Sequence, residues 1–285
     1  MNHRHEHTDA LSEDGVLSFL DPVAVPVNVR VHSSVTSTND VAKGLASAGA
    51  LPGTVIVAES QTAGKGRMGR SFYSPPGCGI YMSLILRPAR AESRLLLTTA
   101  VAVAAARAIE RACDCRIQIK WVNDLYLGGK KIAGILTEAV LYGKAGAGPE
   151  PEGGEAGAAG CVIVGIGLNV RESEDGFPDD LAEKAGVLCA GGAAVSRNRL
   201  AAELIREIWR TVKGFDEQPE EWRRACLAEA RSRSCVLGRE VRVEGHERLT
   251  DARAVGLDEQ GALIVEDDTG CRHALNSGEI SLRLR

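Results

Sequence analysis

The stretch that decides the fold covers residues 117–136 and reads IQIKWVNDLYLGGKKIAGIL. Its first five residues alternate between apolar and polar side chains, which predicts a half-buried β-strand. The glycine pair at 128–129 predicts a turn, after which a second strand begins at two adjacent lysines. Successive side chains of a strand point to opposite faces. One of Lys130 and Lys131 should therefore face water, and the other the sheet interior or a cleft.

Polar side chains gather where the first of these strands ends. Asn123 and Asp124 lie there, directly after Trp121 and Val122. A lysine that faces a cleft beside them carries a large desolvation cost unless an anion is bound nearby. The constellation therefore favours an anion-binding cleft. The alternative interpretation is a pair of exposed lysines in a turn.

A second informative stretch, residues 59–70, reads ESQTAGKGRMGR. Its glycines match G-x-G-x-x-G, but a dinucleotide-binding fold needs a helix directly after that motif, and the SPPG at 74–77 leaves little room for one. We instead expect a mobile loop whose backbone N–H groups approach an anion, with charge supplied by Lys65, Arg67 and Arg70. The alternative is a solvated basic loop. The aromatic rings of Phe72 and Tyr73 follow directly and could stack on a flat ligand when the loop closes.

The pattern around these stretches predicts an α+β fold in which helices flank a mixed sheet. A hydroxyl or amide cap among Ser37–Asn39 predicts a helix that ends near Gly49. The other expected elements are strands at 54–58, 79–86, 131–142 and 161–170, an alanine-rich helix at 93–112, and helices near 198–213 and 219–231.

The C-terminal residues 236–285 predict a separate small β-barrel. Apolar residues alternate at Val241 and Val243 and again at Leu263 and Val265, with glycine turn signals between the strands. Acidic residues outnumber arginines in this segment, which is unfavourable for nucleic-acid binding. We therefore expect the barrel to pack against the main domain, assigned to residues 29–235, or against a protein partner.

Two segments have compositions that predict disorder. Residues 1–28 carry three histidines, acidic residues and prolines, and are expected to form a disordered tail too short for a DNA-reading helix-turn-helix. Residues 143–160 consist mainly of glycine, alanine, proline and glutamate, and are expected to form a flexible insert within a hairpin.

Composition limits the classes of function. The 285 residues carry a formal net charge of −4, so no global basic field attracts nucleic acid. A membrane span needs roughly 20 apolar residues, and the longest such run is shorter. The N-terminus lacks a secretory pattern, and the eight cysteines include no C-x-x-C pair, so we expect reduced thiols in a cytoplasmic protein. We expect no metal site, either at Cys113 and Cys115 or elsewhere.

Taken together, these stretches resemble the biotin–protein ligases over roughly residues 30–171. The C-terminal barrel is similar to the small SH3-like domain of that family, and the expected form lacks an N-terminal DNA-binding domain. Five motifs occur in register: Ser37-Thr38-Asn39, the loop from Gln61 to Arg70, Lys120-Trp121-x-Asn123-Asp124, Lys131-x-Ala133-Gly134-Ile135-Leu136, and Gly165-Ile166-Gly167-Leu168-Asn169.

The resemblance implies a two-step reaction. Biotin and MgATP would form biotinyl-5′-AMP and pyrophosphate, and a lysine of a biotin carboxyl carrier protein would then attack the mixed anhydride. The implied catalytic residues are Lys131, Arg67 and Asp124. The residues implied to bind biotin or its adenylate are Ser37, Thr38, Asn39, Gln61, Gly64, Lys65, Gly66, Arg67, Phe72, Trp121, Asn123, Lys131, Gly134 and Asn169.

The sequence departs from the family pattern at three positions. Lys65 stands where arginine is usual, which keeps the charge but loses the bidentate fork of a guanidinium. Val122 stands where proline is common, and Phe72 where tryptophan is frequent.

Alternative functions follow from the same resemblance. They are a lipoate or octanoate ligase of the same fold, a biotin-sensing repressor and a non-catalytic carrier-binding protein. The resemblance also allows a homodimer.

Overall fold

A computed structural model describes residues 9–88, 94–141, 160–189, 195–244, 251–276 and 281–284. Its main feature is a seven-stranded sheet in the order β1-β2-β3-β7-β6-β5-β4. These strands are β1 (Asn28–His32), β2 (Thr54–Ala58), β3 (Gly79–Leu86), β4 (Gln118–Lys120), β5 (Asp124–Leu127), β6 (Lys130–Leu141) and β7 (Gly160–Asn169).

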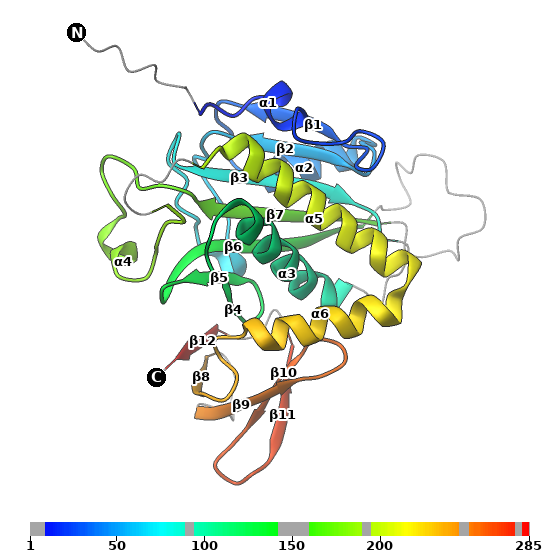
Figure 1. The fold of residues 1–285 in the computed structure, drawn as a ribbon. Helices are drawn as coiled ribbons and strands as arrows, with labels where there is room; N and C mark the ends of the chain where they lie inside the picture. Colours follow the sequence, from blue (N-terminus) through cyan, green and yellow to red (C-terminus); the bar gives the residue numbers. More distant parts are fainter. Residues whose placement is uncertain are drawn as a thin grey trace.

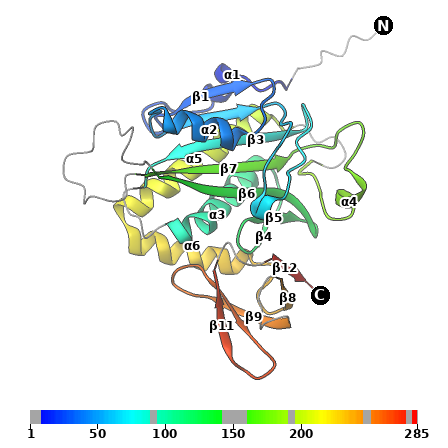
Figure 2. The same ribbon diagram turned by 180° about the vertical axis from the view of Figure 1, so that it is seen from behind.

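Helices cover both faces of this sheet. Figures 1 and 2 show α3, α5 and α6 on one face and α2 on the other. The helices are α1 (Glu13–Leu17), α2 (Thr38–Ser47), α3 (Arg94–Ala112), α4 (Asp179–Ala182), α5 (Arg197–Glu217) and α6 (Pro219–Arg233). The alanines at 100, 102, 104, 105, 106 and 108 of α3 are fully buried. Their small side chains allow α3 to pack closely against the sheet and against α5.

The predicted mixed sheet is confirmed. Strands β1 and β2 pair in parallel, and every other pair in the sheet is antiparallel. The structure differs from the expected single strand at 117–121, because β4 ends at Lys120 and a separate strand, β5, begins at Asp124. Asp124 pairs with Lys120 on one side and with Gly134 on the other, so the polar residues lie at a sharp reversal between two strands.

The expected disordered tail is wrong for residues 9–28. Leu11, Val16, Leu20 and Val25 are buried in the main core, and α1 lies against β1 and α5. The side chain of Ser12 caps α1 by accepting a hydrogen bond from the backbone N–H of Gly15 at 3.0 Å. The burial of these apolar side chains therefore outweighs the conformational entropy that is lost when residues 9–28 become ordered. Residues 1–8, with the three histidines, lie outside the described residues.

The predicted insert at 143–160 also lies outside the described residues, apart from Gly160, which begins β7. Each of the eight cysteines is free. Burial raises the pKa of Cys113 to about 11 and that of Cys226 to about 12, so these thiols stay protonated at neutral pH. Cys271 is exposed. In the part of the chain that the structure describes, none of the helices has the length and apolarity to cross a membrane.

The C-terminal residues form a second, antiparallel sheet in the order β11-β10-β9-β8-β12. Its strands are β8 (Glu240–Glu244), β9 (Asp251–Leu257), β10 (Leu263–Glu266), β11 (Arg272–Leu275) and β12 (Ser281–Leu284). As expected, it packs on the main domain. The indole N–H of Trp121 donates to the Gly261 carbonyl at 2.9 Å, and Arg231 of α6 donates to the Leu257 carbonyl at 2.7 Å.

A charged cluster holds α6 against α3. The buried Arg233 donates to Glu110 at 2.6 Å and to Glu229 at 2.8 Å, and Glu229 also pairs with Arg107. Burial opposes ionisation of both glutamates. The arginine hydrogen bonds outweigh it, so the pKa of Glu110 and the pKa of Glu229 are lowered.

Replacing Arg233 is expected to destabilise the fold strongly. Arg233→Met should lower the free energy of unfolding by about 3 kcal/mol, because Glu110 is left partly buried without its partner. In the wild type, the stabilisation that this cluster provides should be complete at pH values above the pKa of the glutamates in the unfolded chain. It should be lost as the pH falls through their lower pKa in the folded protein.

Urea titrations at pH 7 and at acid pH measure this stability. Arg223→Met is the matched control, since Arg223 lies on the same helix and pairs with the exposed Glu220, and it should cost less than about 1 kcal/mol. Equal stability losses for the two variants at pH 7 would contradict the assigned role of the cluster.

Candidate active site

A cavity of about 760 Å³ lies between the first turn of α2, the glycine-rich loop (residues 64–70) and the ends of β5, β6 and β7. This size is typical of a small-molecule site. It brings together nearly all the residues that the sequence singled out. Those that line it are Ser37, Thr38, Asn39, Gln61, Lys65, Gly66, Arg67, Phe72, Trp121, Asn123, Asp124, Lys131, Gly134 and Asn169.

Gly64 is the exception. It lies outside the lining, and a Cβ atom there would come within 2.5 Å of the Phe72 carbonyl oxygen. The position therefore needs glycine for packing inside the loop.

Two glycines from adjacent strands form part of the cavity wall. Gly134 of β6 and Gly167 of β7 are register partners, and the ring of Phe72 lies against both. A Cβ atom at Gly167 would lie 2.4 Å from the Phe72 Cε1 atom, and one at Gly134 would lie 3.5 Å from Cε2. Any side chain at 167 would therefore displace the ring.

Lys131 is the lysine that faces the cavity. Its Nζ lies 2.7 Å from Oδ1 of Asp124, whereas Lys130 directs its Nζ to the Ala182 carbonyl at 3.2 Å. The predicted split of the two lysines to opposite faces is confirmed. The segment at 184–186 holds the Lys131 backbone, because its N–H donates to the Lys184 carbonyl and its carbonyl accepts from Gly186. The amine is therefore carried by a strand that is hydrogen-bonded on both sides.

Arg67 extends from the loop toward the same place. Its Nη1 donates to Oδ1 of Asn123 at 2.8 Å, and the Asn123 amide donates to the Ile135 carbonyl at 3.0 Å. The Nη2 atom is buried and makes no hydrogen bond to the described residues. Burial lowers the pKa of Arg67, and the nearby Asp124 carboxylate acts in the opposite direction. A buried guanidinium nitrogen without an acceptor is a ready site for an anion.

The glycine-rich loop is itself hydrogen-bonded, which corrects one expectation. The N–H groups of Gly66, Arg70 and Phe72 donate to carbonyl oxygens within the loop, so they are not free for an anion. Lys65 also differs from the prediction, because its Nζ forms an ion pair with Asp40 at 2.6 Å. In this structure Arg67 is therefore the loop cation best placed to meet a ligand anion.

A chain of polar side chains supports one end of the cavity, where Thr38 and Gln61 are part of the lining. Ser83 donates to Thr38 at 2.8 Å, the N–H and hydroxyl of Thr38 donate to the Gln61 oxygen, and the Gln61 amide donates to Ser74. Ser37 precedes α2 but makes no capping hydrogen bond with its side chain. This end offers donors and acceptors in fixed positions.

Asn39 belongs to a second polar group behind that chain. Its amide donates to Glu138 at 2.7 Å, and its oxygen lies 2.6 Å from the Ser83 hydroxyl. A Cβ atom at Gly165 would come within 2.1 Å of the same oxygen. Asn39 therefore joins α2 to the sheet, and Gly165 gives it room.

Sequence reasoning missed Lys120. Lys120 lines the cavity, its Nζ lies 5.9 Å from the ring centroid of Tyr126, and burial lowers its pKa while Asp124 opposes the shift. Lys120 and Asp124 are register partners because the chain reverses between β4 and β5, a break that the sequence did not predict. Trp121 lines the cavity as predicted but is almost completely buried, and its indole N–H donates to the Gly261 carbonyl in the turn between β9 and β10.

Comparisons with known proteins place the chain in a family. Residues 31–148 match the biotin/lipoate A/B protein ligase family, and residues 236–283 match the biotin protein ligase C-terminal domain. The chain is 31% identical to the bifunctional ligase/repressor BirA of Bacillus subtilis over 95% of this chain and 79% of that protein. It belongs to the biotin protein ligase family.

Other members of the biotin protein ligase family agree in sequence and in structure. The biotin--[acetyl-CoA-carboxylase] ligase of Mycobacterium tuberculosis is 32% identical over 90% of this chain and 88% of its own length. The biotin protein ligase of Aquifex aeolicus, solved in complex with biotin and ATP, superposes with a TM-score of 0.73 and 28% identity. That match covers 90% of this chain and 99% of the other. The chain is thus an enzyme of the ligase class with the fold of this family.

Proposed function

We propose that this ligase activates biotin with ATP as biotinyl-5′-AMP, releases pyrophosphate, and transfers biotin to a lysine of a biotin carboxyl carrier protein. The observation that carries the proposal is the convergence of Lys131 and the unpartnered Nη2 of Arg67 on one cavity. The family membership supports the same assignment, as does the related Aquifex aeolicus ligase, which was solved in complex with biotin and ATP.

Charge neutralisation is the main physical demand of the first step. The biotin carboxylate must approach the α-phosphate, and the two anions repel each other. In the proposed complex Lys131 lies between them and Arg67 contacts the phosphate, so that positive charge meets the negative charge that develops. A carboxylate oxygen forms a bond to the α-phosphorus, the bond to the β-phosphate oxygen breaks, and pyrophosphate leaves.

Asn123 and Asp124 act through these two cations. Asn123 fixes one arm of Arg67, and the Asp124 carboxylate fixes Lys131 while the site is empty. When the substrate anions bind, Lys131 exchanges this partner for them, which leaves the carboxylate available for the second step.

The polar end of the cavity suits the ureido ring of biotin. A ureido group offers two N–H donors and one carbonyl acceptor. Ser37, Thr38 and Gln61 provide hydroxyl and amide groups that can meet both kinds. Their fixed hydrogen-bond chain holds this end at a set distance from Lys131.

In the second step the amine of the carrier lysine attacks the acyl carbon of the adenylate. A C–N bond forms, the C–O bond to AMP breaks, and the nitrogen passes its proton to the Asp124 carboxylate. Asp124, a carboxylate of the cavity lining that lies beside Lys131, orients the incoming ammonium. Phe72 and the glycine-rich loop cover the wall beside it and exclude water from the reactive anhydride.

Mg²⁺ enters this scheme as part of the MgATP substrate, since it typically binds through substrate phosphates and one or two carboxylates. The eight free cysteines support a cytoplasmic location. We keep the homodimer as a proposal that a sedimentation measurement would test.

Intact-mass spectrometry of a carrier fragment tests the assignment. With this protein, biotin and MgATP, the fragment should gain one biotinyl group, and omission of ATP should abolish the gain. Parallel reactions with lipoate and octanoate examine the alternative ligase activity. Modification by lipoate or octanoate but not by biotin would overturn the proposal.

A further inference from the structure

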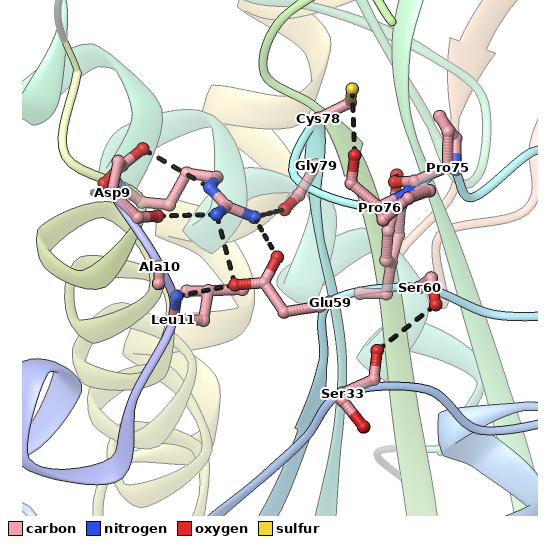
Figure 3. A network of polar contacts seen from close by, with 12 residues as sticks. Asp9, Ala10, Leu11, Ser33, Glu59, Ser60, Pro75, Pro76, Cys78 and Gly79 are labelled. Atoms are coloured by element: carbon pink, nitrogen blue, oxygen red, sulfur yellow. Dashed lines mark hydrogen bonds and ion pairs between the residues drawn. The ribbon is translucent and has the colours of Figure 1, made fainter. Parts of the chain in front are cut away.

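One buried guanidinium joins the two ends of the segment that carries the glycine-rich loop. Arg197, the first residue of α5, is only 3% exposed. Its Nη1 donates to the Glu59 carboxylate at 2.7 Å and to the Gly79 carbonyl at 3.2 Å (Figure 3). Glu59 follows β2 and Gly79 begins β3, so residues 60–78 leave the sheet and return to it at the same side chain. Arg197 therefore links the two ends of this segment, at the point where it leaves and rejoins the sheet; we call this point the neck.

Residues 9–11 of the N-terminal segment bond to Arg197 and Glu59, and we call this group of residues, together with Gly79, the clamp. The backbone N–H of Arg197 donates to Oδ1 of Asp9 at 2.9 Å. The Nη2 atom of Arg197 donates to the backbone carbonyl of Asp9 at 2.5 Å. The backbone N–H of Leu11 donates to the Glu59 carboxylate at 2.6 Å. Figure 3 shows Asp9, Leu11 and Glu59 gathered at this place. Arg171 forms a further ion pair with Asp9. Two arginines thus face two carboxylates.

A single residue, Ser60, separates the clamp from the cavity lining along the backbone. Glu59 faces Arg197, whereas Gln61 accepts from Thr38 at the polar end of the cavity. Between them, the Ser60 hydroxyl donates to the Ser33 carbonyl at 3.2 Å, as Figure 3 shows. On the returning arm, Tyr81 donates to the Pro75 carbonyl at 2.9 Å. A shift of Glu59 would therefore move Gln61 and the root of the glycine-rich loop together.

We infer that Arg197 is a positioning residue for the glycine-rich loop, and that residues 9–11 set how firmly the loop covers its ligand. The part that concerns the ligand rests on the proposed function. The order of the loop, however, can be measured without any reaction, so failure of the two proposals can be distinguished.

Limited digestion with trypsin provides that measurement, because the loop offers Lys65, Arg67 and Arg70 as cleavage sites. For Arg197→Met without ligand, cleavage within residues 65–70 should be about tenfold faster than in the wild type, since local opening becomes easier. Asp9→Ala, which removes one carboxylate and leaves Glu59 in place, should give a smaller increase of about threefold.

Arg206→Met is the matched control. Arg206 also lies on α5 and also donates to the N-terminal segment, at the Phe19 carbonyl, but it is not part of the neck. Its cleavage rate should equal that of the wild type. Circular dichroism and thermal melting verify that each variant is folded. If Arg197→Met does not fold, Asp9→Ala against Arg206→Met decides the question.

A kinetic readout separates positioning from a general loss of stability. In Arg197→Met the KM for biotin and the release rate of the adenylate should rise while the kcat of adenylation changes little, and Arg197→Lys should restore part of the affinity. Unchanged loop cleavage in folded Arg197→Met, or in Asp9→Ala, would overturn the inference. If loop cleavage is faster in the variants but the wild type forms no adenylate, the inference about the clamp is supported and the proposed function is refuted.

Discussion

Lys131→Met is expected to lower the rate of biotin-dependent ATP–pyrophosphate exchange by about 10³-fold or more, because it removes charge stabilisation from the site of attack. Lys131 is the strand lysine whose amine faces the cavity, where it lies 2.7 Å from Asp124. Methionine keeps the length of the side chain but leaves the two substrate anions without the cation between them. Initial rates of exchange with and without biotin measure the effect.

Lys130→Met is the control for this prediction. Lys130 is the adjacent residue on the same strand, and among the described residues its amine donates to the Ala182 carbonyl, which does not line the cavity. The exchange rate of Lys130→Met should therefore stay within about twofold of the wild type. Equal losses for the two variants would show that strand packing, rather than the amine of Lys131, determines activity. Thermal melts of both proteins should be nearly unchanged, since neither side chain is buried.

Gly167→Ala is expected to lower adenylate formation by about 10²-fold, the scale of a displacement of about 1 Å near a reacting centre. The new Cβ atom would lie 2.4 Å from the Phe72 ring, which rests on the wall formed by Gly134 and Gly167. The ring must then move, and with it the part of the loop that carries Arg67. Single-turnover formation of the adenylate measures the change.

Gly256→Ala is the matched control, because Gly256 also lies within a strand and a Cβ atom there would meet nothing within 4 Å. It should leave adenylate formation unchanged. A combined Gly167→Ala and Phe72→Ala variant should regain part of the activity, since the clash is removed. Unchanged activity in Gly167→Ala alone would contradict the assigned position of the ring.

The local sequence pattern was sufficient to predict much of the sheet and the cavity-facing amine of Lys131. The glycine turn at 128–129 and the two lysines after it predicted a strand with one lysine facing a cleft, and the structure confirms that this residue is Lys131. The strand before that turn is β5, which the alternation at 117–121 did not predict. The caps and apolar spacing predicted α2, α5 and α6 within a few residues. These features depend on residues that are near neighbours in the chain.

The parts that could not be predicted depend on contacts between distant residues. Asp9 meets Arg197 across 188 positions, and nothing in the composition of residues 9–28 indicates this partner. The need for glycine at 165 and 167 becomes apparent only when Asn39 and Phe72 are placed against them. Lys65 was expected to bind an anion because its charge is visible in the sequence, whereas its partner Asp40 lies on a different element.

Direct detection of the acyl-adenylate tests the central claim, which is that Lys131 and Arg67 let two anions react. Purified protein is incubated with biotin and MgATP without any carrier, and the bound product is extracted and identified by mass spectrometry. The account predicts biotinyl-5′-AMP in close to one equivalent per active site, and almost none in Lys131→Met. No adenylate from the wild type, or the same amount from Lys131→Met, would contradict it.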